Sequence, residues 1–86
     1  MVSFDIKWKA SAKKELRKIS QSEIPKIINT IEKLSIDQHP QYSKKIIGTK
    51  HIFRIRIGSY RVIYSIQNEK LIIEIIKAGH RKEIYK

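Results

Sequence analysis

The chain opens with a strict alternation of apolar and polar side chains. The apolar positions are Val2, Phe4, Ile6 and Trp8. Successive side chains of a β-strand point to opposite faces of a sheet, so a period of two is typical of a strand with one buried face. We therefore expect a half-buried strand over residues 2–8.

Helical spacing replaces this alternation after residue 10. Ala12, Leu16 and Ile19 recur at intervals of four and three residues, which predicts a short amphipathic helix. Ser11 is the candidate N-cap of this helix. The predicted outer face is basic and carries Lys13, Lys14, Arg17 and Lys18.

A second helix is predicted by apolar residues at Ile24, Ile27, Ile28, Ile31 and Leu34. Two starts compete for it. Ser20 and Glu23 match a capping box, but that start leaves Pro25 beyond the first turn. With Ser22 as the N-cap, Pro25 falls inside the first turn, where proline is better tolerated. The helix must end before Pro40.

Three further strands are predicted after a polar connection over residues 38–50. They cover residues 52–57, 60–66 and 71–77, joined by the turn Gly58-Ser59 and a turn over residues 67–70. The element order is β-α-α-β-β-β. The fold class that follows is α+β, with a two-helix hairpin packed on one face of an antiparallel sheet. A chain of 86 residues supports one domain, which we place over residues 1–86.

The first hairpin defines the two faces of the predicted sheet. A two-residue loop at Gly58-Ser59 places Arg56 directly opposite Arg61. The core face then holds Phe53, Ile55, Ile57, Tyr60, Val62 and Tyr64. The opposite face, which we name the arginine face, holds Ile52, Arg54, Arg56, Arg61 and Ile63.

Like charges that face each other across two strands are normally destabilising, and two explanations of the opposed arginines compete. The guanidinium groups can spread into solvent, where screening leaves a cost below about 1 kcal/mol. Alternatively, an anion binds between them, since the planar donor fork of arginine suits phosphate. Three arginines on one face favour the bound anion.

The third strand adds apolar side chains to both faces. If residues 67–70 form the turn, Leu71, Ile73 and Ile75 join the core face. The arginine face then gains Ile72, Glu74 and Ile76. The isoleucines beside the cations form an apolar patch rimmed by charge, which is typical of a protein-binding surface. The alternative, that the C-terminal tail folds over this patch, stays open.

Charge is the strongest signal in the composition. The chain has 19 Lys and Arg residues against 8 Asp and Glu residues, a formal net charge of +11. Such a protein attracts polyanions, with nucleic acid as the first candidate and an acidic protein as the second. The absence of cysteine excludes disulfide bonds and thiolate metal sites. Since we find neither a signal peptide nor a long apolar run, we expect a cytoplasmic protein that does not bind membranes.

The C-terminal third resembles a known family. The segment RIRIGSYRVIY, followed by LIIEIIKAGHRKEIYK, is similar to the RelE branch of the RelE/ParE toxin superfamily. The shared features are a hairpin with a Gly-x-Tyr-Arg turn and a strand ending in Gly, then His or Lys, then Arg, with a Tyr farther on. The N-terminal β-α-α order agrees with the family at the level of the pattern.

The resemblance implies a toxin of a type II toxin–antitoxin system that enters the ribosomal A site and cuts the mRNA there. Such toxins are small basic endoribonucleases that need no metal or cofactor. A cognate RelB-like antitoxin wraps the toxin and holds it inactive. The functional positions of the family fall on Arg54, Arg56, Arg61, Arg81 and Tyr85 of this chain.

The chemistry of such a cut can be reasoned from the residues. Cleavage of RNA by its own 2′-hydroxyl requires a base, an acid and stabilisation of the charged phosphorane. Arg61 and Arg81 are suited to stabilise the phosphorane, and Tyr85 could stack on a base or hold the nucleophile in line.

The proton acceptor is the open question. Well-studied bacterial members of the family have lysines where this chain has Arg54 and Arg56, and a guanidinium keeps its proton. His80 can exchange a proton near neutral pH and lies beside Arg81 in the sequence, so it is our candidate acid or base. The residues expected to bind RNA are Arg54, Arg56, Lys13, Arg17 and Lys50.

Two rival functions remain open. The first is a ParE-like toxin that inhibits DNA gyrase, although the tail with Arg81 and Tyr85 argues against it. The second is a catalytically weak homologue that binds RNA and its antitoxin. The two arginines at the usual lysine positions keep this second rival open.

Overall fold

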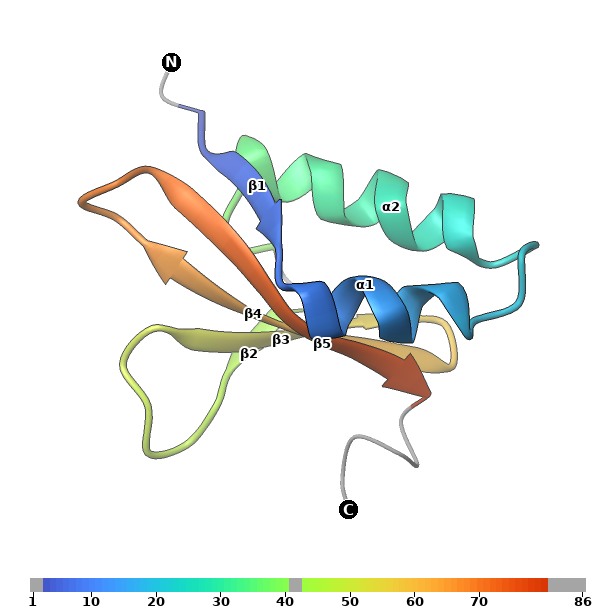
Figure 1. Cartoon of the computed structure of the whole chain (residues 1–86). Helices are drawn as coiled ribbons and strands as arrows, with labels where there is room; N and C mark the ends of the chain where they lie inside the picture. The colour runs from blue at the N-terminus through green and yellow to red at the C-terminus, as the bar shows by residue number, and fades with distance from the viewer. Residues whose placement is uncertain (1–2, 41–42, 81–86) are drawn as a thin grey trace.

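The computed structural model describes residues 3–40 and 43–80. Its elements are β1 (Asp5–Trp8), α1 (Ala10–Arg17), α2 (Ile24–Glu32), a 3-10 turn η1 (Lys33–Ser35), β2 (Ser43–Lys45), β3 (Ile52–Ile57), β4 (Tyr60–Gln67) and β5 (Ile72–His80). Both helices lie on the same side of one sheet (Figure 1). The expected α+β fold class is confirmed. Val2, the first apolar residue of the predicted strand, lies outside the described residues.

The sheet has five strands in the order β1-β5-β4-β3-β2. It differs from the expected sheet in two respects. β1 runs parallel to β5, so the sheet is mixed rather than wholly antiparallel. The predicted polar connection contains the short strand β2, which pairs antiparallel with β3. No helix in the described part of the chain is long and apolar enough to cross a membrane.

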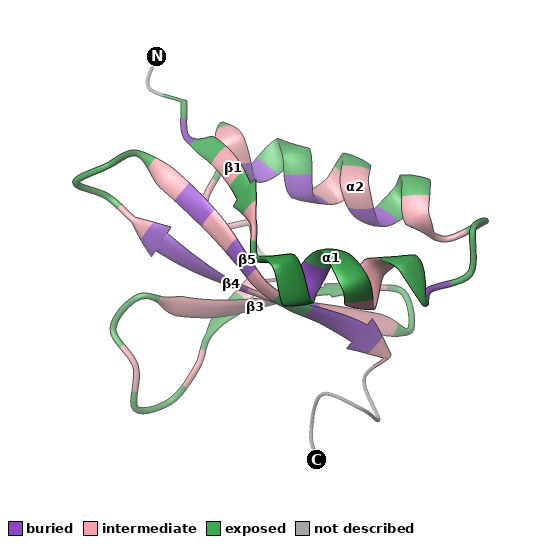
Figure 2. Ribbon diagram, in the orientation of Figure 1, coloured by how far each residue is buried: buried purple, intermediate pink, exposed green. Residues whose placement is uncertain are grey.

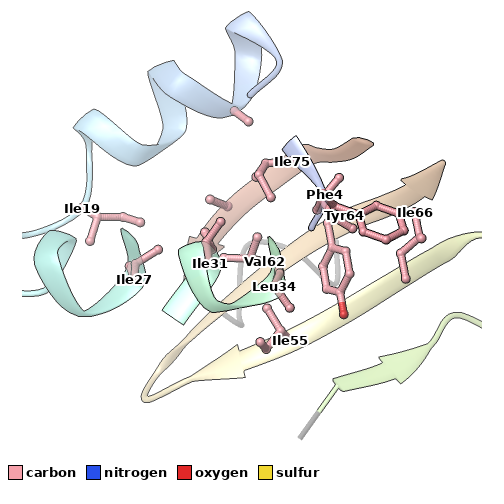
Figure 3. Close-up of a cluster of buried hydrophobic side chains, with 13 residues drawn as sticks. Phe4, Ile19, Ile27, Ile31, Leu34, Ile55, Val62, Tyr64, Ile66 and Ile75 are labelled. Atoms are coloured by element: carbon pink, nitrogen blue, oxygen red, sulfur yellow. The ribbon is translucent and has the colours of Figure 1, made fainter. Parts of the chain in front are cut away.

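The core lies between the sheet and the helices (Figure 3). Ile55, Val62 and Tyr64 from the sheet are fully buried, and they face Ile31 of α2 and Leu34 of η1. These sheet residues occupy alternate positions of β3 and β4, as the period of two predicts. The predicted core face therefore lies under the helices, and the arginine face is the other side of the sheet.

Both helices begin close to the predicted positions but with different caps. The N-cap of α1 is Lys9, which has an extended backbone, so Ser11 lies inside the helix and is exposed. The N-cap of α2 is Glu23 rather than Ser20 or Ser22. Pro25 lies in the first turn, as the second start required, because a missing N–H costs no intrahelical bond there.

The turn between β4 and β5 is shifted from its predicted place. Gln67 pairs with Ile72, so the turn covers residues 68–71 instead of 67–70. The prediction that Leu71 joins the core face is wrong: the residue is 42% exposed and has a positive φ of 55°. Ile73 and Ile75, by contrast, are fully buried as expected.

An irregularity in β5 changes the direction of its last side chains. Ile63 pairs with Lys77 and Tyr64 with Ile75, which leaves Ile76 as the extra residue of a β-bulge. A bulge of one residue reverses the alternation of faces beyond it. Gly79 is therefore opposite Arg61, and His80 is opposite Tyr60.

Candidate functional site

The opposed arginines are a feature of the folded protein. β3 and β4 pair so that Arg56 is opposite Arg61 and Ile57 is opposite Tyr60. Gly58 has a positive φ of 60°, the backbone conformation that a glycine-first hairpin turn requires. The predicted register is therefore confirmed, and Arg54 lies two residues along β3 on the same face.

The three arginines line one pocket together with Lys44. This space, which we name the arginine pocket, has a volume of about 270 Å³ and is lined by Lys44, Arg54, Arg56 and Arg61. Arg56 and Lys44 are exposed, and Arg54 and Arg61 are half-buried. Four formal positive charges around one solvent-accessible space form a site that suits a phosphate group.

Lys44 and Lys77 extend the arginine face beyond the predicted residues. Lys44 of β2 is opposite Arg54 of β3, which is opposite Ile63 of β4, which is opposite Lys77 of β5. Residues in one such row point to the same side of the sheet. The sequence does not indicate that Lys44 lies on the arginine face, because β2 has three residues and shows no alternation of apolar and polar side chains.

Part of the arginine face is apolar, as the sequence predicts. Ile52, Ile63 and Ile72 lie at positions of the register that face this side, and all three are half-buried. Ile76, the fourth predicted member, is the extra residue of the bulge. The face therefore combines cations with apolar side chains, a composition that suits both RNA and a protein partner.

His80 does not line the arginine pocket. Its ring lies against the ring of Tyr60, with the centroids 5.8 Å apart in an edge-to-face arrangement. It lines a cavity of about 340 Å³ with Glu15 and Lys18 of the helix layer. The bulge at Ile76 is the physical reason, since a regular strand would have placed His80 on the arginine face.

The other predicted RNA-binding cations are also separate from the arginine pocket. Lys13 and Arg17 are exposed on α1, which lies on the opposite side of the sheet (Figures 1 and 2). Lys50 is exposed in the loop before β3, at the end of that strand far from Gly58. The structure thus brings together Arg54, Arg56 and Arg61, and not these three cations.

Arg81 and Tyr85 lie outside the described residues, so their predicted roles stay predictions. Within residues 3–40 and 43–80, the structure contains no cluster of three or more His, Cys, Asp or Glu side chains that could hold a metal ion.

Comparison with known proteins identifies the family. Residues 6–85 match the family model described as "ParE toxin of type II toxin-antitoxin system, parDE". The protein named "Putative toxin RelE1" of Methanocaldococcus jannaschii is 28% identical in an alignment 88 positions long, which covers 99% of this chain and 98% of that protein.

Solved structures of RelE toxins share the fold. The archaeal RelE–RelB complex from Pyrococcus horikoshii matches with a TM-score of 0.81 and 25% identity, over 93% of this chain and 97% of that chain. A mutant of the E. coli toxin RelE in the free state matches with a TM-score of 0.83 and 20% identity, over 98% of this chain and 92% of that chain. The family model covers nearly the whole sequence, and the fold and the relatives agree with it. The chain therefore belongs to the RelE/ParE superfamily of toxins from type II toxin–antitoxin systems and is a RelE family toxin.

Proposed function

We propose that this toxin is a ribosome-dependent endoribonuclease that cuts mRNA in the ribosomal A site and so inhibits translation. The observation that carries the proposal is the arginine pocket, where three guanidinium groups surround a space that suits a phosphate. The excess of positive charge over the whole chain supports RNA as the substrate.

The proposal gives each arginine a role. Arg61 stabilises the negative charge that develops on the phosphorane, because it lines the pocket and is half-buried, where charge stabilisation is stronger than in water. Arg54 and Arg56 hold the neighbouring phosphates and keep the cleaved bond in place. Arg81 adds to the stabilisation of the phosphorane and Tyr85 stacks on a base, as the family resemblance implies. His80 lines a different cavity, so we assign it no proton transfer in this pocket.

A direct test is to induce the chain in growing cells and to map the 5′ ends of the mRNAs. We expect cuts in phase with the codons, and we expect Arg61→Ala to reduce them by about 100-fold or more, as loss of a transition-state donor does. Lys33→Ala is the matched control, because it removes one exposed cation from the helix layer. Growth arrest without any cut in the mRNA would disprove the proposed nuclease.

The family model that matches the chain is named for ParE toxins, and this favours gyrase inhibition as the second candidate function. Purified toxin and DNA gyrase in a supercoiling assay separate the two candidates. Inhibition of supercoiling by the wild-type chain, together with intact mRNA in cells, would support this alternative. Tight antitoxin binding without either effect would identify a catalytically weak homologue.

The proposed partner is a RelB-like antitoxin that covers the arginine face. The solved RelE–RelB complexes from Pyrococcus horikoshii and E. coli support such a partner. The half-buried isoleucines beside the arginines offer apolar contacts to a protein, and the cations offer contacts to acidic side chains. Because ribosomes and mRNA are the proposed targets, we place the activity in the cytoplasm.

A further inference from the structure

The arginine pocket contains one side chain that differs chemically from the rest. Of the four described residues that line it, three carry guanidinium groups, and Lys44 carries an amine. A guanidinium stays protonated in proteins and can donate hydrogen bonds but cannot accept a proton. An amine can lose its proton and then accept another one. Among the described residues that line the arginine pocket, Lys44 is therefore the one whose side chain can accept and return a proton.

Lys44 reaches this pocket through the pairing of the edge strand. Lys44 of β2 is directly opposite Arg54 of β3, so the two side chains point to the same side of the sheet. The next residue, Lys45, is opposite Phe53 and points to the other side. One of two adjacent lysines thus lines the phosphate site, and the other, which is also exposed, does not.

We propose that Lys44 is the general base of the arginine pocket, an inference that rests on the proposed nuclease function. The neutral amine of Lys44 takes the proton of the RNA 2′-hydroxyl while the 2′-oxygen attacks phosphorus. The new bond from phosphorus to the 2′-oxygen forms as the bond to the 5′-oxygen breaks. The leaving 5′-oxygen takes a proton from water, and the hydroxide that remains removes the proton from the Lys44 ammonium. The products are a 2′,3′-cyclic phosphate and a 5′-hydroxyl end.

The proposal separates two roles that a cation in this pocket could have. A residue that only attracts phosphate needs its charge, and arginine would serve as well as lysine. A residue that accepts a proton needs a neutral form, so arginine cannot replace it. The substitution Lys44→Arg keeps the charge and removes the base, and it therefore distinguishes the two roles.

The test measures single-turnover cleavage of mRNA by the full-length toxin on ribosomes with a defined codon in the A site, between about pH 6 and pH 9. We expect Lys44→Arg to lower the rate by about 100-fold or more, the usual contribution of a general base, and to remove the rise of rate with pH. Lys45→Arg is the matched control and should keep the wild-type rate and pH profile. Binding of an RNA with a 2′-O-methyl group at the cut site should change by less than about threefold in Lys44→Arg, because the charge is retained.

A double substitution provides a second, independent arm. Lys44→Arg combined with Arg54→Lys exchanges the amine and the guanidinium between two paired positions of the same face. We expect it to recover part of the lost rate and the rise with pH. A Lys44→Arg variant that cuts as fast as the wild type would overturn the role of Lys44 and leave the proposed function intact. A wild-type chain that does not cut ribosome-bound mRNA at all would overturn both.

Discussion

Arg56 and Arg61 are directly opposite each other across the β3–β4 hairpin, so that two positive charges share one cross-strand pair of the free toxin. Such a pair opposes folding slightly and favours the binding of an anion strongly. Stability and RNA binding should therefore respond in opposite directions when one of the two charges is removed.

Arg56→Ala tests this opposition directly. Arg56 is exposed, so its removal leaves no cavity, and the free energy of unfolding should rise by up to about 1 kcal/mol at low salt. Affinity for single-stranded RNA should fall, and the slope of log affinity against log salt should decrease by about 0.7 for the lost phosphate contact. Urea unfolding and RNA titrations at several salt concentrations measure both. A large loss of stability would show that Arg56 has a structural role instead.

The two layers of the protein should contribute unequally to RNA binding. Two double variants each remove two positive charges. The first, Arg54→Ala with Arg56→Ala, removes them from the arginine face. The second, Lys13→Ala with Arg17→Ala, removes them from α1. At physiological salt we expect the first pair to weaken RNA binding by about tenfold or more and the second by about threefold or less. Equal losses would show that overall charge, and not the arginine pocket, determines the affinity.

Gly58 should be required for its backbone conformation alone. Its φ is 60°, and a Cβ added at this position would have no atom within 4 Å. Gly58→Ala should therefore cost about 1 kcal/mol of unfolding free energy through backbone strain, and Gly58→Asn should cost less, because asparagine tolerates this region. Urea unfolding of the two variants and of Ser59→Ala, the neighbouring control, checks the prediction. Equal stability of the alanine and asparagine variants would contradict it.

Leu71 offers the reverse experiment. It has a φ of 55°, which is costly for a side chain with a Cβ, and it is 42% exposed. Leu71→Gly should be more stable than Leu71→Ala by about 1 kcal/mol, since both remove the side chain and glycine alone also removes the strain. Thermal or urea unfolding of this pair measures the difference. If the glycine variant is the less stable of the two, the backbone conformation of Leu71 is not strained.

Tyr64 links the core to the end of the helical segment. Its side chain is fully buried, and its hydroxyl donates a hydrogen bond of 3.0 Å to the carbonyl oxygen of Gln38. Tyr64→Phe should lower the free energy of unfolding by about 1 kcal/mol, the usual net worth of such a bond. Tyr60→Phe, at a half-buried tyrosine of the same strand, should cost less. Equal effects in the two variants would argue against this bond as the cause.

The hairpin of the arginine face could be predicted from the sequence because two local rules agree there. The loop of two residues fixes which positions are opposite, and the period of two fixes which side chains share a face. Phe53, Ile55 and Val62 alternate with Arg54, Arg56 and Arg61, so a shift of one residue would bury the charges. The three arginines of the pocket follow from this register.

Lys44 and the direction of His80 could not be predicted from the sequence. A strand of three residues is too short to show a period, so the sequence around β2 indicates only a polar connection. The sequence LIIEIIKAGH is apolar at both odd and even positions, and no local pattern marks the bulge at Ile76. Beyond the bulge, β5 packs against α1, where the backbone N–H of Ala78 donates a 3.4 Å hydrogen bond to the carboxylate of Glu15.

The bulge in β5 makes the pairing of that strand as important as its composition. A relative with the same residues whose β5 paired without this bulge would place its alanine, and not its glycine, opposite Arg61, and it would turn its histidine to the arginine face. Loss of the bulge from an unchanged sequence would therefore exchange the groups that reach the two sides of the sheet. Two members of the family could then share every functional residue by name and still differ in which of them lie on the arginine face.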